Sequence, residues 1–256
     1  MVGAPAAADA VARARRLPDL GVGLHLVLVD GLPVLPPKEI SGLVRGNGVL
    51  DANMARAGLR FFALPHIRRQ LAKEIQAQFE AFRATGLRLD HVNAHKHIHV
   101  HPSLAKLIIE IGRDFGMKAV RVPAEPIPIL RRVFPRERLL MPPYSPWVES
   151  LRRRLKRAGL VANDNMFGLA WSGKMVETRF LELIPHLPDG VNEIYCHPGT
   201  RSTPALAAAM PGYRHREELA ALLSPSVKSR IVELGIRLVT YNDFRDPANQ
   251  NLISGR

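Results

Sequence analysis

The sequence predicts an α/β protein in which parallel strands form a barrel or an incomplete barrel. Short apolar runs, typical of buried strands, alternate along the chain with longer segments that have a helical period. The chain has 256 residues, close to the about 250 residues of a single-domain (β/α) barrel. We therefore expect one domain over residues 1–256.

The first 86 residues contain two predicted helices, one predicted strand and one long loop. Residues 4–16 have a weak apolar stripe that Pro18 ends, and residues 21–29, GVGLHLVLV, read as a buried parallel strand. Residues 30–60 carry three prolines and five glycines, which predicts an irregular loop. Residues 67–85 form an amphipathic helix that Gly86 ends.

A histidine-rich stretch, HVNAHKHIHVHP, covers residues 91–102 and holds five of the protein's ten histidines. The histidines alternate with other residues, and this period of two predicts a strand with Asn93, His95, His97 and His99 on one face. Imidazole is a frequent metal ligand and acid or base. The alternative is a surface strand or a histidine tract without a defined site.

The rest of the chain continues the alternation. A helix at 103–115 and a strand at 117–122 precede a segment at 123–146, rich in proline and arginine, that looks like an insertion. The further elements are a helix from 145 to about 158, a polar loop at 163–175, a strand at 191–197, helices at 215–223 and 225–234, and a last strand at 236–241.

Three of these strands carry histidines within them or at their ends: His25, His95 to His99, and His197. In parallel α/β folds the site forms at the carboxyl ends of the strands, so we expect these histidines to converge there. For His25 the alternative is a hydrogen-bonded histidine of the core. Cys196 is expected to be a buried structural cysteine, because adjacent strand residues face opposite sides.

The composition limits the partners and the compartment. The formal charge is +13, and basic residues are concentrated in 129–157. We read this region as a solvated basic face or as a surface for anionic lipid, and we expect no nucleic acid because no aromatic-basic motif accompanies the charge. The helix after residue 145 either docks on the domain or lies on a membrane. One cysteine and no apparent signal or membrane span favour the cytoplasm.

Four motifs together resemble one known family. GLHLVL at 23–28, NAHKHIHVHP at 93–102 and EIYCHPG at 193–199 resemble the YdjC-like carbohydrate deacetylases, and FGLAWSGKM at 167–175 is similar to their hopanoid-biosynthesis-associated branch. The resemblance covers the whole chain. It implies a TIM-barrel-like fold, a divalent metal (Mg or Zn), and hydrolysis of the amide of an N-acetylated sugar. The implied substrate is the N-acetylglucosamine-type head group of a hopanoid lipid, with peripheral contact at an anionic inner membrane; a dimer is compatible with this.

The resemblance also assigns roles to individual residues. His25 is the implied metal ligand of the GLHL motif. The second histidine ligand is His97, with His95 the next candidate. His197, in the CHPG motif, resembles the general acid. We assign Asn93, His99, Asp164 and Trp171 to substrate binding.

One family motif is missing from this sequence. The family begins with a strand ending in Asp-Asp-Phe-Gly, whose carboxylates supply the base and a metal ligand, so we expect a fold that is incomplete at the amino terminus and an activity reduced about 10²–10⁴-fold. Asp90 should face away from His95 by strand parity, and Glu193 should lie about 13 Å from His197 along its strand. Asp30, Asp164 and Asp243 stay open as substitutes.

Two other functions compete with deacetylation. A metallophosphoesterase also uses a histidine-rich barrel mouth, although more carboxylates would be expected in a site with several metals. A basic module that binds anionic lipid or nucleic acid without catalysis would bind with a steep salt dependence.

Overall fold

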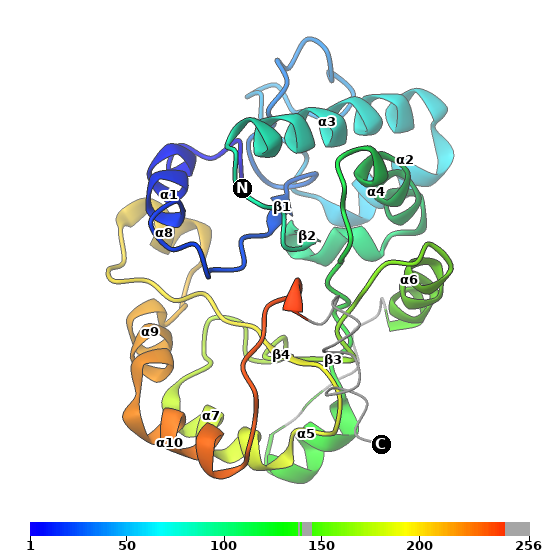
Figure 1. The fold of residues 1–256 in the computed structure, drawn as a ribbon. Helices are drawn as coiled ribbons and strands as arrows, with labels where there is room; N and C mark the ends of the chain where they lie inside the picture. Colours follow the sequence, from blue (N-terminus) through cyan, green and yellow to red (C-terminus); the bar gives the residue numbers. More distant parts are fainter. Residues whose placement is uncertain (138, 140–144, 244–256) are drawn as a thin grey trace. The chain divides into compact units, whose positions relative to one another are not determined.

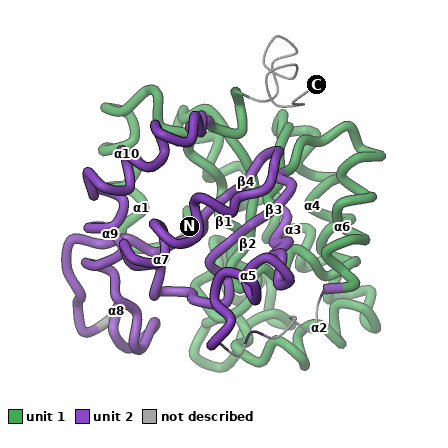
Figure 2. The backbone as a smooth tube through the Cα atoms, turned by 90° about the horizontal axis from the view of Figure 1, so that it is seen from below, with its two compact units in different colours: residues 1–121, 146–162, 240–250 green, residues 122–145, 163–239, 251–256 purple. Residues whose placement is uncertain are grey.

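The computed structural model describes residues 1–137, 139 and 145–243. It shows a mixed α/β protein in which helices accompany small parallel sheets (Figure 1). The chain divides into two compact units (Figure 2). Unit 1 comprises residues 1–121, 146–162 and 240–250, and unit 2 comprises 122–145, 163–239 and 251–256.

Unit 1 contains a parallel pair of strands and five α-helices. Strands β1 and β2 pair in the register Leu24↔Val92 and His25↔Asn93. Two single-residue parallel bridges, Val92↔Val120 and Ala119↔Val161, continue this arrangement. The elements are α1 (Ala7–Ala14), β1 (Leu24–Leu26), α2 (Met54–Ala63), α3 (Pro65–Ala84), β2 (Val92–Ala94), the 3₁₀ helix η1 (His95–Val100), α4 (Pro102–Asp114) and α6 (Ser145–Arg157, of which Ser145 belongs to unit 2).

Helix α3 organises unit 1 because it buries one apolar stripe and two polar groups. Ile67, Leu71 and Ile75 are fully buried on that stripe. Glu74 and Gln78 are also buried, and both bind the backbone that follows β1. Gln78 accepts a hydrogen bond of 2.9 Å from the Val27 N–H and donates one of 2.7 Å to its carbonyl. The helix thus satisfies the backbone of an irregular segment that has no ladder partner of its own.

Unit 2 contains the second parallel pair, β3 and β4, and a core of its own. Phe167, Met175 and Leu183 are completely buried in that core. The elements are α5 (Ile127–Val133), β3 (Asn165–Phe167), α7 (Glu177–Leu183), the 3₁₀ helix η2 (Ile184–His186), β4 (Asn192–Ile194), α8 (Pro204–Ala209), α9 (His215–Leu223) and α10 (Pro225–Glu233).

The structure confirms the predicted helices and the parallel pairing, and it corrects four other predictions. The loop predicted at 30–60 gives way to α2 from Met54, the strand at 117–122 is reduced to single bridges, and residues 236–241 form no strand. The histidine strand ends at Ala94, where η1 begins. The barrel, and the single domain with an insertion at 123–146, remain predictions; residues 138 and 140–144 of that insertion lie outside the described part.

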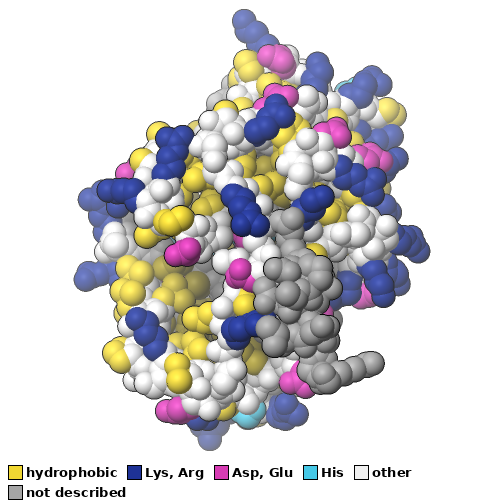
Figure 3. Space-filling view, viewed as in Figure 1, with side chains coloured by type: hydrophobic (Ala, Val, Ile, Leu, Met, Phe, Trp, Pro, Cys, Tyr) yellow, Lys and Arg dark blue, Asp and Glu magenta, His cyan; other side chains and the backbone are white. Residues whose placement is uncertain are grey.

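Helix α6 docks on unit 1 through its apolar stripe. Val148, Leu151 and Leu155 are buried, and the Trp147 ring lies 5.9 Å from Phe62. The basic residues of the helix cover its other faces. This is the arrangement predicted by the first of the two alternatives, in which the helix docks on the domain. On the face shown in Figure 3, lysine and arginine side chains lie at many separate places among apolar ones. No helix in the described ranges has the length and apolar content to cross a membrane.

Candidate active site

His25 lies in the middle of β1, directly opposite Asn93 of β2. The register brings the two side chains to the same face, and His25 Nδ1 lies 2.6 Å from Asn93 Oδ1. Since an amide oxygen only accepts, His25 donates from Nδ1 and its Nε2 carries the lone pair. Burial lowers the pKa of His25 to about 3, although the Asn93 bond acts in the opposite direction. His25 is therefore neutral at physiological pH.

His95 is the side chain that packs beside His25. It occupies the first position of η1, immediately after β2 ends, and its ring meets the His25 ring edge to face with centroids 5.8 Å apart. Burial lowers the pKa of His95, and the positive charge of Lys96 lowers it further. Two neutral imidazoles thus share one edge of the β1–β2 pair.

His97 does not share the position of His95, because the backbone turns between them. Lys96 and His97 have φ values of 51° and 53°, in the left-handed region that is uncommon for side-chain-bearing residues. The strand parity predicted for His97 and His99 is therefore wrong. The His97 ring lies 6.3 Å from that of His99, and His99 is buried with Nε2 2.9 Å from the Arg121 carbonyl oxygen. The structure favours His95 over His97 as the partner of His25.

The fit to a metal is partial. A neutral imidazole whose other nitrogen is held by a hydrogen bond is the usual form of a histidine ligand, and His25 has this form. His95 would supply a second nitrogen. Within the described residues, however, no three histidine, cysteine or acidic side chains lie close enough together to hold a metal ion.

The three carboxylates left open as substitutes occupy different surroundings. Asp30 forms an ion pair with Lys96. Its negative charge partly opposes the lowering of the His95 pKa by burial. Asp164 accepts a hydrogen bond from the Val191 backbone N–H, at 2.8 Å, in unit 2. Asp243 accepts from the backbone and hydroxyl of Thr240. Asp30 thus places a negative charge that acts on His95 of the candidate site.

His197 belongs to unit 2 and follows β4. Its Nε2 lies 2.8 Å from the Tyr195 hydroxyl, and its ring lies 5.0 Å from the ring of Tyr213. Its backbone is held at both ends: the N–H donates to Glu218 Oε2 at 2.6 Å, and the carbonyl accepts from His215 Nδ1 at 2.7 Å. The segment carrying His197 is thus fixed by side chains from α9.

The remaining residues assigned to substrate have structural contacts. Trp171 is buried among the core of unit 2, where its Nε1 donates to Glu137 and its ring packs on Phe134. Asn93 is 6% exposed, with its oxygen bound to His25. The roles of Asn93, His99, Asp164 and Trp171 in substrate binding stay predictions.

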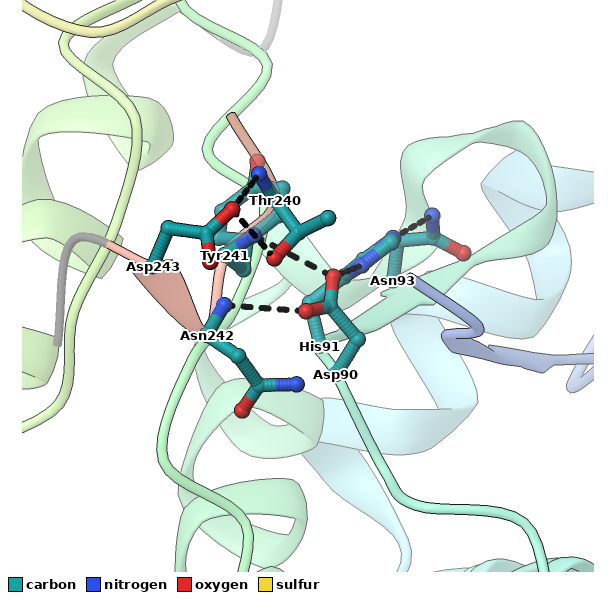
Figure 4. A network of polar contacts seen from close by, with 7 residues as sticks. All are labelled: Asp90, His91, Asn93, Thr240, Tyr241, Asn242 and Asp243. Atoms are coloured by element: carbon teal, nitrogen blue, oxygen red, sulfur yellow. Dashed lines mark hydrogen bonds and ion pairs between the residues drawn. The ribbon is translucent and has the colours of Figure 1, made fainter. Parts of the chain in front are cut away.

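Sequence reasoning missed Glu218, described above, as a support of the segment that carries His197. It considered Asp90 only as a substitute carboxylate and set it aside; the structure shows Asp90 3% exposed and 2.9 Å from His91 Nδ1 (Figure 4). The available signal was Gly21-Val22-Gly23, since glycines at this spacing in a strand let another segment approach closely.

Comparison with known proteins gives a consistent result. The family model described as "YdjC-like protein" matches residues 1–233. A carbohydrate deacetylase of Geobacillus stearothermophilus is 28% identical over 246 residues, which cover 95% of this chain and 84% of the relative. A chitooligosaccharide deacetylase of Yersinia pestis (strain Pestoides F) is 29% identical over 233 residues, covering 88% and 79%.

A solved structure has the same fold. It is a protein of Enterococcus faecalis V583 that its description associates with cellobiose-phosphate cleavage, and it matches with a TM-score of 0.69 and 21% identity. The match covers 94% of this chain and 85% of that protein. At this identity the likeness concerns the fold.

Proposed function

Because this chain belongs to the YdjC-like protein family, we propose that it is a hydrolase that removes the acetyl group from an N-acetylated sugar. Relatives named as carbohydrate and chitooligosaccharide deacetylases support this activity. The structural observation that carries the proposal is the edge-to-face contact of His25 with His95 on the β1–β2 pair. Neutral imidazole nitrogens at this position can serve as metal ligands or as hydrogen-bond acceptors.

The states of the two histidines limit what each can do. With a pKa of about 3, His25 does not take up and release a proton during turnover near neutral pH. Its Nε2 lone pair instead acts as a ligand or as a hydrogen-bond acceptor. His197 keeps its predicted role, protonation of the departing amine.

Dependence on Mg or Zn is part of this proposal. When bound, a divalent metal would polarise the amide carbonyl and lower the pKa of bound water. His25 and His95 are the residues that would hold it. The described residues do not bring three ligands together, so metal binding is measured separately, by titration calorimetry of the wild type and of His95→Gln.

We further propose the hopanoid branch of the family, with an N-acetylglucosamine-type lipid head group as substrate. The FGLAWSGKM motif supports this assignment. A second support is the outer face of α6, where Arg153, Lys156 and Arg157 are exposed. Such a face is attracted to anionic lipid by about 1 kcal/mol per basic residue near the surface. Peripheral membrane contact and a dimer belong to the same proposal.

The testing experiment measures acetate released by the purified chain, with zinc or magnesium, from two substrates. One is an N-acetylated chitooligosaccharide, and the other is an N-acetylglucosaminyl lipid in vesicles. Release from both supports deacetylation, and faster release from the lipid supports the hopanoid branch. No acetate from either substrate contradicts the proposal, and phosphate released from a sugar phosphate would replace it with the phosphoesterase reading.

A further inference from the structure

A buried carboxylate, Asp90, stands at one end of a chain of hydrogen bonds. Asp90 lies just before β2 and is 3% exposed. Its Oδ1 accepts from the Asn242 N–H at 2.9 Å, and its Oδ2 accepts from the Tyr241 N–H at 3.3 Å (Figure 4). Residues of unit 1 that lie 151 and 152 positions from Asp90 in sequence thus fix both of its oxygens.

The chain of hydrogen bonds continues from Asp90 to the candidate site. Asp90 Oδ2 lies 2.9 Å from His91 Nδ1. His91 Nε2 lies 3.3 Å from Asn93 Nδ2, and Asn93 Oδ1 lies 2.6 Å from His25 Nδ1. Hydrogen bonds therefore connect four side chains in the order Asp90, His91, Asn93 and His25, from the buried carboxylate to the histidine whose ring contacts His95.

The chemistry of these groups gives the chain one direction. A carboxylate only accepts, so His91 donates from Nδ1 and its Nε2 must accept. The Asn93 amide then donates from Nδ2 to His91 and accepts at Oδ1 from His25. One set of proton positions satisfies every bond, and in it His25 carries its proton on Nδ1.

We propose that Asp90, His91 and Asn93 form a directed relay that holds His25 as the Nδ1–H tautomer, with its Nε2 lone pair presented to the site. The three are positioning residues, because they act on the reaction through His25. The tautomer of His25 does not depend on the proposed function. Only the use of the Nε2 lone pair in hydrolysis rests on that function.

The packing around His91 is built for this arrangement. A Cβ added at Gly23 would lie 2.6 Å from the Cε1 and Nε2 atoms of the His91 ring, and one at Gly21 would lie 3.0 Å from the Asp90 carboxylate. The opposite side is covered by Tyr241, whose ring stacks on His91 with centroids 4.5 Å apart. The imidazole is thus held between a glycine and an aromatic ring, which leaves it little freedom to turn.

The experiment reads the His25 tautomer directly. Protein labelled with ¹⁵N in its histidine rings is examined by long-range ¹H–¹⁵N NMR, which distinguishes a protonated from an unprotonated ring nitrogen. The His25 signals are identified by their loss in His25→Gln. We expect protonated Nδ1 and unprotonated Nε2 in the wild type.

Asp90→Asn and His91→Phe test the relay in two different ways. In Asp90→Asn the carboxamide oxygen is expected at the position of Oδ2, where it accepts from both His91 Nδ1 and the Tyr241 N–H, so His25 is expected to keep the Nδ1–H tautomer. In His91→Phe the stack on Tyr241 is kept but both nitrogens are lost, and His25 is expected to show a mixture of tautomers. His101→Phe is the matched control, since His101 is a buried histidine whose Nε2 binds the Gly58 carbonyl outside the relay.

The outcomes separate the relay from the function. A mixture of tautomers in His91→Phe, with the wild-type tautomer in Asp90→Asn and in His101→Phe, supports the relay whether or not acetate is released. Nε2–H in the wild type, or an unchanged tautomer in His91→Phe, overturns it. With an active enzyme, His91→Phe should lower kcat about 10–100-fold at unchanged KM; an unchanged kcat would overturn the catalytic use of the relay alone.

Unfolding is controlled in the same samples. Dispersed amide spectra establish that each variant is folded, and a variant that fails this criterion is replaced by Asn93→Asp. The second oxygen of this aspartate faces His91 Nε2, which must then donate as well, so His91 takes up a second proton and becomes an imidazolium between two carboxylates, while His25 still donates from Nδ1. The Asn93→Asp variant should therefore keep the wild-type tautomer of His25, and a reversed His25 would overturn the relay.

Discussion

The carboxylate of Glu218 holds the backbone N–H of His197 at 2.6 Å. The other oxygen of Glu218 accepts from the Met175 N–H at 2.8 Å. Both bonds are charge-assisted, and Glu218 is fully buried in α9. This one side chain therefore fixes two loop segments of unit 2, one of which carries the proposed general acid.

Replacing Glu218 with glutamine should destabilise unit 2. Glutamine keeps the shape of the side chain but turns an amide NH₂ toward one of the two backbone N–H groups. We expect a loss of about 1–3 kcal/mol in the free energy of unfolding, measured with urea. Glu217→Gln, at the exposed neighbouring position of the same helix, should change it by less than about 0.5 kcal/mol. Equal losses in both variants would contradict the proposed role of Glu218.

Gly23→Ala should also destabilise the protein, for a steric reason. The new methyl group would lie 2.6 Å from the His91 ring, which Tyr241 confines from the other side. Overpacking of this kind costs about 1–3 kcal/mol. The control is Gly46→Ala, where a Cβ meets nothing within 4 Å and the expected effect is a gain of up to about 1 kcal/mol. Thermal and urea unfolding of both variants tests the difference.

Gln78→Met tests whether α3 holds the segment after β1. Methionine fills similar space but leaves the N–H and the carbonyl of Val27 without their buried partner. A cost of about 1–3 kcal/mol is expected. Gln76→Met, on the exposed face of the same helix, supplies the matched control and should be nearly neutral. If both variants unfold at the same urea concentration as the wild type, Val27 is not held by Gln78.

The contribution of Asp51 to the stability of the protein should be lost in acid. The hydrogen bond from Arg56 lowers the pKa of Asp51 to about 2, and burial acts in the opposite direction. Since the unfolded value is about 3.9, the contribution is complete above pH 4 and is lost as the pH falls from about 4 to about 2.

The measurement is the free energy of unfolding at pH 7 and at pH 3. We expect Asp51→Asn to lose about 1–2 kcal/mol at pH 7 and less at pH 3, because Asp51 of the unfolded wild-type chain is already mostly protonated at pH 3. The control is Asp9→Asn, which removes a fully exposed pair with Arg13. A loss for Asp51→Asn that is equal at both pH values would contradict this account.

Six of the described helices, α1, α3, α4, α6, α9 and α10, could be predicted from the sequence because their signals are local, whereas the short helices α5, α7 and α8 were not predicted. Ile67, Leu71 and Ile75 repeat at helical spacing in α3, and Pro65 and Gly86 mark its ends. Helix α2 was missed because it lies in a region rich in glycine and proline, where only its Asn53 cap indicated a start. The strands were predicted too long because an apolar run does not show where the ladder ends.

The site was predicted in part for a related reason. His25 and Asn93 face each other because both lie in true strands, where a period of two holds. The rule fails at Lys96, whose left-handed backbone separates His95 from His97, and no residue type there announces the turn. Asp90 was set aside by parity, but it is connected to His25 through two other side chains, those of His91 and Asn93.

The most direct test of the central claim compares three histidine variants in the acetate-release assay. Our account predicts that His25→Gln and His95→Gln each lower kcat/KM at least about 10²-fold, whereas His66→Gln, at an exposed position of α3, leaves it unchanged. Wild-type activity in His25→Gln and His95→Gln would contradict the claim that these two histidines form the active site.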